Sequence, residues 1–187
     1  MNIIKTKLKD CVIIEPKVFG DERGFFLETF QADRYADLSG ISLPFVQDNH
    51  SRSSKGVLRG LHFQKTKPQG KLIRVVRGMV YDVAVDIRLG SLTYGQWEGH
   101  ELTAENGEQL YIPVGFAHGF VTLESDSEIV YKCSNDYAPE TEGAVLWNDP
   151  AIGINWPVEA DPILSKKDFA APLLADLESP FIFGENS

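Results

Sequence analysis

A succession of short β-favouring runs, separated by turn residues, constrains this sequence more than any other feature. β-Branched and aromatic side chains are concentrated in Val12–Phe19, Gly24–Phe30, Leu72–Val76, Met79–Ile87 and Glu128–Ser134. The 187 residues contain no evident linker, internal repeat or low-complexity tract, and they suffice for one domain with a buried core. Many short strands in one domain predict an all-β sandwich or barrel.

Two details of this pattern predict local geometry. In Met79–Ile87, apolar residues alternate with residues such as Asp82 and Asp86, which is the period of a half-buried strand. The pair Arg77-Gly78 separates two strand-like runs. Such a pair is typical of a tight turn, so we expect a hairpin there.

Helices are expected at only two places. The segment Gln31–Ser39 is a plausible helix that Gly40 would close. A second helix begins near Ser165, whose side chain can cap it, with Asp168 at the third position of a capping box. These helices would flank the strands and do not change the all-β class.

The segment Ser51–Arg77 is purely basic, although the chain as a whole is acidic. It contains eight Lys or Arg residues and no Asp or Glu, whereas the formal net charge of the chain is −9. A local positive field on a negative protein favours a site for a small anion over a nucleic-acid surface. His62 lies in this segment, and an imidazole exchanges protons near neutral pH. The combination predicts proton-transfer chemistry on an anionic small molecule.

The sequence predicts a cytoplasmic protein that does not span a membrane. Its first residues lack the apolar run of about 7–15 residues found in signal peptides. No segment approaches the ~20 apolar residues of a membrane span. Cys11 and Cys133 match no metal-binding or redox spacing, so we expect two free thiols.

Two segments of the strand pattern resemble the paired motifs of the cupin family, whose members are jelly-roll barrels. The first segment begins with Gly56 and, after five residues, His62. The second matches closely and contains, in order, Gly107, Pro113, Gly115 and His118, with Thr122 where the family has Asn. The resemblance implies a jelly-roll β-barrel with a few short flanking helices.

The first of these motifs is broken at the positions that would bind a metal. Gln64 replaces the family's second His, and two other residues stand where its Glu would fall. A cupin metal site needs three imidazoles and a carboxylate, of which only His62 and His118 remain. We therefore expect a barrel without a metal. The alternative is that Glu128, or an Asp from another strand, completes a site.

Seven segments are similar, in order, to those of the dTDP-4-dehydrorhamnose 3,5-epimerase family. They are Val57–Gln64, Gly70–Gly78, Asp82–Arg88, Tyr94–Trp97, Ile112–Phe120, Tyr131–Cys133 and Trp147–Pro150. The resemblance implies a homodimeric isomerase without a cofactor that inverts C3 and C5 of a dTDP-linked 4-keto-6-deoxyglucose. The product lies on the route to L-rhamnose and cell-surface polysaccharide. Residues 1–187 would form one epimerase domain, with N-terminal strands and a C-terminal helical segment packing on the barrel.

The resemblance also assigns four catalytic residues. Epimerisation beside a ketone needs a base, an acid on the opposite face and a group that stabilises the enolate oxygen. His62 matches the base, and Asp168 matches the carboxylate that orients its imidazole. Tyr131 matches the acid, because a phenol is protonated at neutral pH. Lys71 matches a residue near the C4 oxygen. Taken singly, each also fits an ordinary structural role, such as barrel wall, edge charge or helix-end acid.

Substrate recognition is assigned to a larger set of residues. A pyrophosphate favours guanidinium groups, and Arg23 and Arg59 match family positions for this task. Phe19 and Phe26 are candidates for stacking on the thymine. The remaining expected contacts are Glu28, Gln47, Asp48, Asn49, Lys71, His118, Glu142 and Lys167. The resemblance also implies that the N-terminal strands cross to a partner chain, so that each site contains residues of both chains.

One pair of these residues conflicts with a regular strand. Arg59 and His62 are three positions apart, so that a straight strand would point them to opposite faces. Gly60 lies between them and can supply a bulge. We therefore predict an irregularity at Gly60 that turns both side chains into one site.

Three functions remain open at this point. The first is the double epimerase, which requires proton donors on both faces of the sugar. The second is a related metal-free mono-epimerase or ketoisomerase that acts on a dTDP-keto sugar. The third is a sugar-binding or anion-binding cupin that exchanges no protons. Deuterium uptake at the sugar carbons distinguishes all three.

Overall fold

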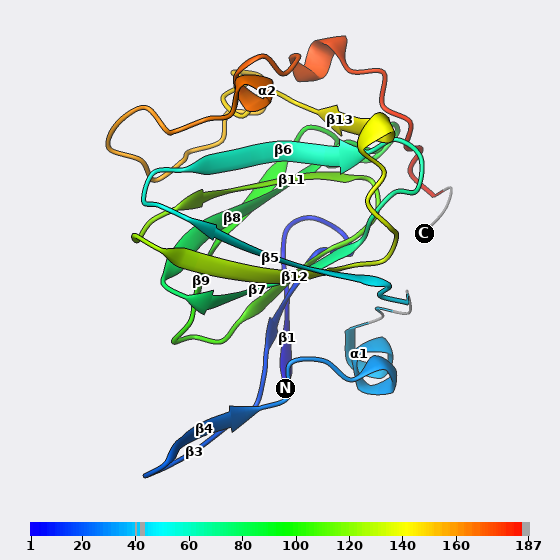
Figure 1. The fold of residues 1–187 in the computed structure, drawn as a ribbon. Helices are drawn as coiled ribbons and strands as arrows, with labels where there is room; N and C mark the ends of the chain where they lie inside the picture. The colour runs from blue at the N-terminus through cyan, green and yellow to red at the C-terminus, as the bar shows by residue number, and fades with distance from the viewer. Residues whose placement is uncertain (40, 42–43, 185–187) are drawn as a thin grey trace.

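Antiparallel strands make up most of the computed structural model, which describes residues 1–39, 41 and 44–184 (Figure 1). The strands of the six-stranded sheet are, in spatial order, β1 (Asn2–Lys5), β2 (Val12–Glu15), β10 (Gln109–Ile112), β7 (Lys71–Arg77), β12 (Ser127–Cys133) and β5 (Gln47–Ser53). Those of the five-stranded sheet are β13 (Glu142–Ala144), β6 (Leu58–Gln64), β11 (Phe116–Thr122), β8 (Met79–Asp86) and β9 (Trp97–Thr103). From β5 to β8, consecutive strands alternate between the two sheets. This arrangement confirms the predicted all-β jelly-roll barrel.

The barrel is closed by apolar side chains that both sheets direct into the space between them. Ile73 and Ile129 from the six-stranded sheet pack in one cluster with Val80, Ala84 and Phe120 from the five-stranded sheet. All five side chains are at most 6% exposed. Their burial supplies the hydrophobic free energy that holds the two sheets face to face.

The strand β8 is buried on both faces, so the prediction of a half-buried strand was wrong. One face contributes to the cluster between the sheets. The other face contains Val83 and Val85, which pack with Ile152 and Leu174 from the C-terminal segment. That segment crosses the outer side of the five-stranded sheet (Figure 1). A local alternation of apolar and polar residues cannot reveal that a distant segment covers the second face.

The predicted hairpin at Arg77-Gly78 is also wrong, because β7 and β8 belong to different sheets. Gly78 has a φ of +71°, and a Cβ there would lie 2.4 Å from Ser127 Oγ. The backbone N–H of Met79 donates to the same Ser127 oxygen at 3.1 Å. Glycine is therefore required where the chain crosses from one sheet to the other.

Both expected helices are present. Helix α1 spans Ala32–Ser39, close to the predicted Gln31–Ser39, whereas the predicted closing residue Gly40 lies outside the described residues. Helix α2 spans Lys166–Phe169, and Ser165 caps it by accepting the backbone N–H of Asp168. Two short 3₁₀ turns, η1 (Pro139–Thr141) and η2 (Leu174–Asp176), follow β12 and α2 respectively. Among the described residues, no helix is long and apolar enough to cross a membrane.

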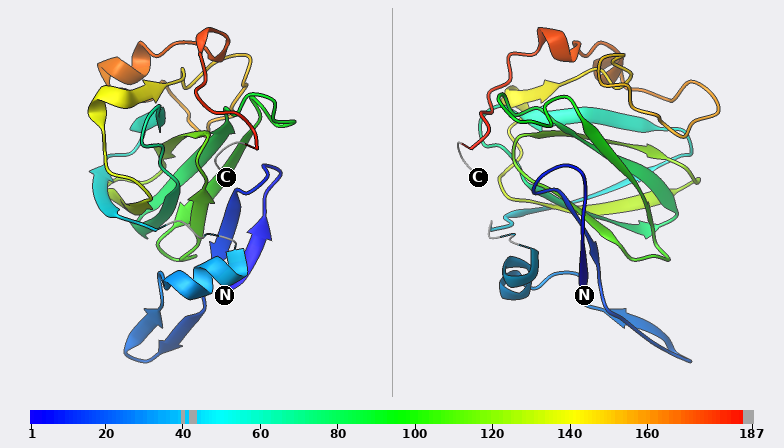
Figure 2. Two further views of the ribbon diagram at one scale, coloured as in Figure 1. Left: turned by 90° about the vertical axis from the view of Figure 1, so that its right-hand side faces the viewer. Right: turned by 180° about the vertical axis from the view of Figure 1, so that it is seen from behind.

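A separate hairpin of β3 (Val18–Asp21) and β4 (Gly24–Leu27) extends away from the barrel (Figures 1 and 2). Its aromatic side chains Phe25 and Phe26 are 71% and 69% exposed. Large apolar side chains are rarely this exposed at two consecutive positions of a folded domain.

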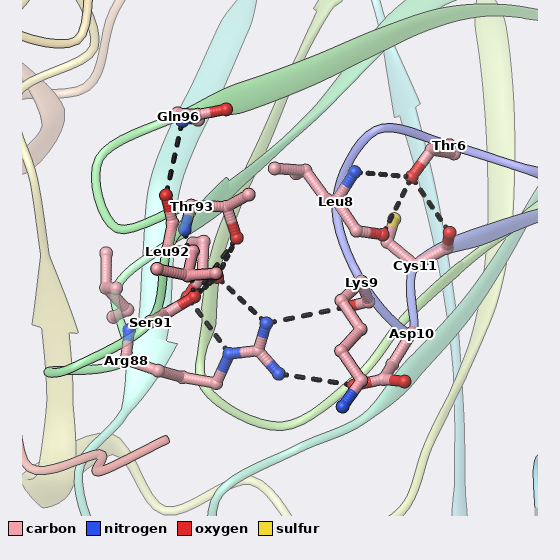
Figure 3. A network of polar contacts seen from close by, with 12 residues as sticks. Thr6, Leu8, Lys9, Asp10, Cys11, Arg88, Ser91, Leu92, Thr93 and Gln96 are labelled. Atoms are coloured by element: carbon pink, nitrogen blue, oxygen red, sulfur yellow. Dashed lines mark hydrogen bonds and ion pairs between the residues drawn. The ribbon is translucent and has the colours of Figure 1, made fainter. Parts of the chain in front are cut away.

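A buried ion pair fixes the loop after β8 (Figure 3). Arg88 donates from Nε and Nη2 to both carboxylate oxygens of Asp86, at 3.0 and 2.8 Å. Ser91 and Thr93 donate their hydroxyls to the same carboxylate, each at 2.6 Å. Arg88 also donates to the Lys9 carbonyl oxygen at 3.4 Å, so that the network joins this loop to the turn between β1 and β2.

Candidate active site

A cavity of about 440 Å³ opens between the two sheets and beneath the C-terminal segment. The six-stranded sheet contributes Gln47, Asn49, Ser51, Lys71 and Tyr131 to its lining, and the five-stranded sheet contributes Arg59, His62, Phe63, Gln64, His118, Phe120 and Glu142. The chain outside the sheets adds Gln69, Tyr137, Ser165, Lys167 and Asp168. All four predicted catalytic residues therefore line one cavity.

The backbone at Gly60 brings Arg59 and His62 to the same cavity. His62 pairs with His118, but Arg59 pairs with Phe120, so that β6 has one more residue than β11 between the two pairs. Gly60 has a φ of +140°, and a Cβ there would lie 2.5 Å from the Gly119 Cα. The predicted irregularity is confirmed, and a side chain at position 60 would push the two strands apart.

His62 and Asp168 are in direct contact although 106 positions separate them. The imidazole Nε2 lies 2.5 Å from Asp168 Oδ1. Burial alone disfavours the charged carboxylate, but hydrogen bonds from His62 and Ser165 outweigh it and lower the pKa of Asp168. Nε2 then carries the proton shared with the carboxylate. No described residue hydrogen-bonds to Nδ1, which leaves its lone pair for a substrate proton.

Tyr131 enters the cavity from the other sheet. It lies on β12, whereas His62 lies on β6, so the phenol and the imidazole project from opposing walls. Burial raises the pKa of Tyr131, the nearby Cys133 adds to this effect, and Arg59 partly offsets it. The phenol is therefore protonated at neutral pH and can act as an acid.

Lys71 places an amine in the same cavity. Burial lowers its pKa, and the nearby Cys133, Asp82 and Glu142 act in the opposite direction. Among the described residues, none forms a hydrogen bond or ion pair with Lys71 Nζ. A desolvated ammonium without a partner gains more than a solvated one from a negative charge that develops on a substrate.

His118 is occupied by a carboxylate on a neighbouring strand. Its Nε2 lies 2.9 and 3.1 Å from the two oxygens of Asp82. Burial lowers the pKa of His118, Lys71 and His62 add to the effect, and Asp82 opposes it. The part of the chain that the structure describes contains no group of three or more His, Cys, Asp or Glu able to hold a metal ion. Glu128, the alternative ligand, instead contacts His50 at 3.0 Å and does not line the cavity.

Polar contacts at the cavity mouth involve Glu142 and Lys167, which form an ion pair. The Tyr137 hydroxyl also contacts Glu142, at 3.2 Å. The backbone N–H of Tyr137 donates to the side-chain oxygen of Gln47 at 2.8 Å. Gln64 donates to the Asp136 carbonyl and accepts the Ala138 N–H, at 3.1 and 2.8 Å, which holds the loop that carries Tyr137.

Comparisons with known proteins agree with this geometry. Residues 5–176 match the family model described as dTDP-4-dehydrorhamnose 3,5-epimerase. A relative of that name from Salmonella typhimurium is 59% identical over 93% of this chain and 96% of its own length. The chain belongs to the dTDP-4-dehydrorhamnose 3,5-epimerase family. It is therefore an isomerase of the carbohydrate epimerase class.

Solved structures of the family agree in fold and include both kinds of epimerase. The Legionella pneumophila 3,5-epimerase, solved with dTDP-4-keto-L-rhamnose, has a TM-score of 0.94 and 53% identity, covering 97% of each chain. A 3′-monoepimerase from Streptomyces bikiniensis, solved with dTDP-quinovose, has a TM-score of 0.86 and 36% identity, covering 94% of this chain and 88% of its own. The cupin-type jelly-roll fold is thus shared by relatives that differ in reaction.

Some predicted epimerase residues lie away from the cavity of their own chain. These residues are Phe19, Arg23, Phe26, Glu28 and Asp48, of which the first three line a separate groove on the β3–β4 hairpin. Arg23 pairs with Asp21, and Asp48 accepts from Lys132 at 2.9 Å. Their predicted roles thus require either another chain or a change of side-chain position.

Sequence reasoning missed several residues that line the cavity. Tyr137 was not singled out, because an isolated tyrosine in a loop gives no signal of its own. Ser165 was recognised as a helix cap, and Gln64 only as a replacement for a cupin ligand. The capping pattern was the one available signal, since it links Ser165 to Asp168, a residue already assigned to the site.

Proposed function

We propose that this chain converts dTDP-4-dehydro-6-deoxy-D-glucose into dTDP-4-dehydro-L-rhamnose by inverting C3 and C5. The observation that carries this proposal is the opposition of two proton-transfer groups across one cavity. His62, paired with Asp168, projects from one wall, and the Tyr131 phenol projects from the other. Inversion requires proton removal on one face of a carbon and proton return on the other.

Each epimerisation proceeds in two steps. His62 Nδ1 takes the proton from the carbon beside the ketone, and the C–H electron pair moves to the C4 oxygen to form an enolate. The ammonium of Lys71 stabilises that oxygen. The carbon then takes the Tyr131 proton on its opposite face while the C4 carbonyl reforms. Exchange with solvent returns a proton to the phenolate and removes one from the imidazolium, so that no redox cofactor or metal enters the balance.

The nucleotide end of the substrate is assigned to the cations at the cavity. Arg59 lines the cavity, and its Nε donates to Ser53 at 3.2 Å, which leaves both terminal nitrogens for phosphate oxygens. Lys167 lies at the mouth, where its ion pair with Glu142 partly offsets its positive charge. Gln47, Asn49 and His118 supply further polar contacts to the sugar nucleotide.

The second candidate is epimerisation at a single carbon. A Streptomyces relative named dTDP-4-dehydro-6-deoxyglucose 3-epimerase is 41% identical over 88% of this chain and 84% of its own length. A ketoisomerase with the same fold would also differ from the double epimerase in which sugar carbons exchange protons. The presence of both the imidazole and the phenol supports an epimerase over a ketoisomerase, but inversion at one carbon requires both groups as well. Inversion at two carbons is supported by the relatives named 3,5-epimerase, which are 59% and 53% identical to this chain.

The test is deuterium uptake from heavy water into dTDP-4-dehydro-6-deoxy-D-glucose, followed by NMR at C3 and C5. We expect uptake at both carbons with inversion, and none with His62→Ala. Uptake at one carbon would indicate the mono-epimerase or ketoisomerase. Absence of uptake with the wild-type chain would refute an epimerase acting on this substrate, and normal turnover by His62→Ala would refute the assigned base.

We further propose that the active form is a homodimer in which the β3–β4 hairpin completes the partner's site. Three observations support this: the hairpin extends from the barrel, exposes Phe25 and Phe26, and carries Arg23 away from its own cavity. A protruding apolar hairpin is suited to pair with a second copy of the same chain.

Complementation tests the shared site. We expect His62→Ala and Arg23→Glu proteins each to be nearly inactive alone. After dissociation and random reassociation, about a quarter of the sites combine an intact His62 with an intact Arg23 from the other chain. Recovery of that fraction supports the shared site, and no recovery in verified mixed dimers would refute it.

We also propose a domain organisation and a cellular location for this chain. Residues 1–187 are proposed to form one epimerase domain, because the N-terminal strands join a barrel sheet and the C-terminal segment packs on the other sheet. A cytoplasmic location is supported by Cys11 and Cys133, which are both buried and unpaired.

A further inference from the structure

The carboxylate of Asp168 is held at both of its oxygens. Oδ1 lies 2.5 Å from His62 Nε2, and Oδ2 accepts the Ser165 hydroxyl at 2.8 Å. The same Ser165 oxygen accepts the backbone N–H of Asp168 at 3.1 Å. The Ser165 hydroxyl therefore forms hydrogen bonds with both the backbone and the side chain of Asp168, the residue that contacts the imidazole.

We propose that Ser165 is a positioning residue for catalysis, which aims the Asp168 carboxylate at His62 and so forms a chain of three side chains. This inference rests on the proposed role of His62 as the base. Asp168 needs such a support because it lies on α2, a helix of only four residues outside the barrel sheets. A carboxyl group rotates easily about its last torsion, and a hydrogen bond to the second oxygen restricts that rotation. The fixed carboxylate keeps the proton on Nε2 and the lone pair on Nδ1.

The hydroxyl also affects how strongly the Asp168 carboxylate holds a proton. Donation from Ser165 stabilises the anionic carboxylate and helps to lower the pKa of Asp168, so removal of the hydroxyl raises that pKa. The acidic limb of the kcat/KM profile, which depends on an ionised Asp168, then moves to higher pH. The other charged or titratable groups that line the cavity are unchanged by a substitution at position 165. They are Arg59 on β6, Lys71 on β7, His118 on β11, Tyr131 on β12, Tyr137 in the loop after β12, Glu142 on β13 and Lys167, which lies beside Asp168 on α2. Asp82 on β8 pairs with His118.

Ser91 offers a matched control in the polar network around Arg88, outside the cavity (Figure 3). Its hydroxyl donates to Asp86 Oδ2 at 2.6 Å, and its oxygen accepts the Thr93 N–H at 3.2 Å. Ser91→Ala therefore removes the same two kinds of hydrogen bond as Ser165→Ala. Ser91 does not line the cavity, so this variant reports the structural cost alone.

The experiment compares Ser165→Ala, Ser165→Thr and Ser91→Ala with the full-length wild-type chain. For Ser165→Ala we expect kcat to fall about tenfold with KM within about twofold, since a hydrogen bond to a charged group is lost. The acidic limb of kcat/KM should move to higher pH, and Ser165→Thr should restore both properties. Ser91→Ala should lower Tm and leave kcat and the limb unchanged.

A second readout is independent of turnover. The Nε2–H proton of His62, hydrogen-bonded to a carboxylate, gives a downfield NMR resonance that should shift or broaden in Ser165→Ala and return in Ser165→Thr. Loss of Tm alone, with kcat, pH profile and resonance unchanged, would overturn the inference. An equal effect of Ser91→Ala on the pH profile would also overturn it. A wild-type chain that exchanges no protons would refute the proposed function, while the resonance would still decide whether Ser165 positions Asp168.

Discussion

Replacement of Tyr131 by Phe separates proton removal from inversion. The change deletes one hydroxyl and keeps the ring, which packs against the cluster between the sheets. No described residue forms a hydrogen bond with this hydroxyl, so the deletion leaves no protein group without its partner. We therefore expect the free energy of unfolding to change by less than about 1 kcal/mol.

The effect on inversion should be large. A positioned general acid contributes roughly 10²- to 10⁴-fold, which corresponds to about 3–5 kcal/mol in the barrier of the return step. The base is untouched in this variant, so the enolate still forms. Its proton can then return only from the imidazolium, which lies on the face from which the proton was taken. The product in heavy water should be deuterated substrate of unchanged configuration.

The assay is NMR of the sugar carbons in heavy water, with inversion measured in the same sample. The matched control is Tyr111→Phe, which removes a phenol from β10 in another part of the barrel. That control should retain both exchange and inversion. Inverted product from Tyr131→Phe at a rate near the wild type would refute the assignment of Tyr131 as the acid.

Two further predictions concern the charged residues. Lys71→Met should reduce exchange by about 10²-fold through loss of enolate stabilisation. Lys71→Met should also raise Tm at neutral pH. Because burial lowers the folded-state pKa of Lys71, the unfolded chain binds the proton of this amine more readily than the folded chain does. The charged amine therefore destabilises the fold until the pH rises above the unfolded-state pKa of Lys71. Substrate-free differential scanning calorimetry measures this, and a Tm below the wild type would contradict it. Arg88→Met should cost about 3–5 kcal/mol by urea unfolding at pH 7, since it leaves the buried Asp86 carboxylate without its cation. Burial raises the pKa of Asp86, but hydrogen bonds from Arg88, Ser91 and Thr93 outweigh burial and lower the pKa overall. The stabilisation that the ionised Asp86 provides is therefore present above the unfolded-state pKa and is lost as pH falls through the folded-state pKa. An Arg88→Met penalty that persists in strong acid would contradict this origin.

Local signals predicted five strand-forming runs and both helices, whereas other strands, such as β1, β5, β9 and β10, were not singled out. The run Val12–Phe19 is divided between β2 and β3, which lie in different sheets. β-Branched runs and capping residues depend on the conformational preferences of neighbouring residues, so they can be read without a fold. The irregularity at Gly60 was predictable for a related reason. Once Arg59 and His62 were assigned to one site, their three-residue separation required a bulge.

The wrong predictions concern partners that are distant in sequence. The pair Arg77-Gly78 is typical of a hairpin turn, but the strands on either side of it do not pair with each other. Strand β7 pairs with β10 and β12, and β8 pairs with β9 and β11. The outer face of β8 is buried by a segment that begins about sixty residues later. Both outcomes depend on how the sheets close, which a local pattern does not encode.

By itself, the sequence determined the strand-forming segments, the basic stretch around His62 and the motifs that connect this chain to an epimerase family. The family resemblance named His62, Asp168 and Tyr131, but only the tertiary structure supplied their geometry. It placed Asp168 within 2.5 Å of His62 across 106 positions, left Nδ1 without a hydrogen bond from the described residues, set Tyr131 on the opposing wall and kept Arg23 outside the cavity of its own chain. The physical reason is that strand formation follows from local side-chain preference, whereas a catalytic geometry follows from the pairing and closure of sheets whose strands lie far apart in the chain.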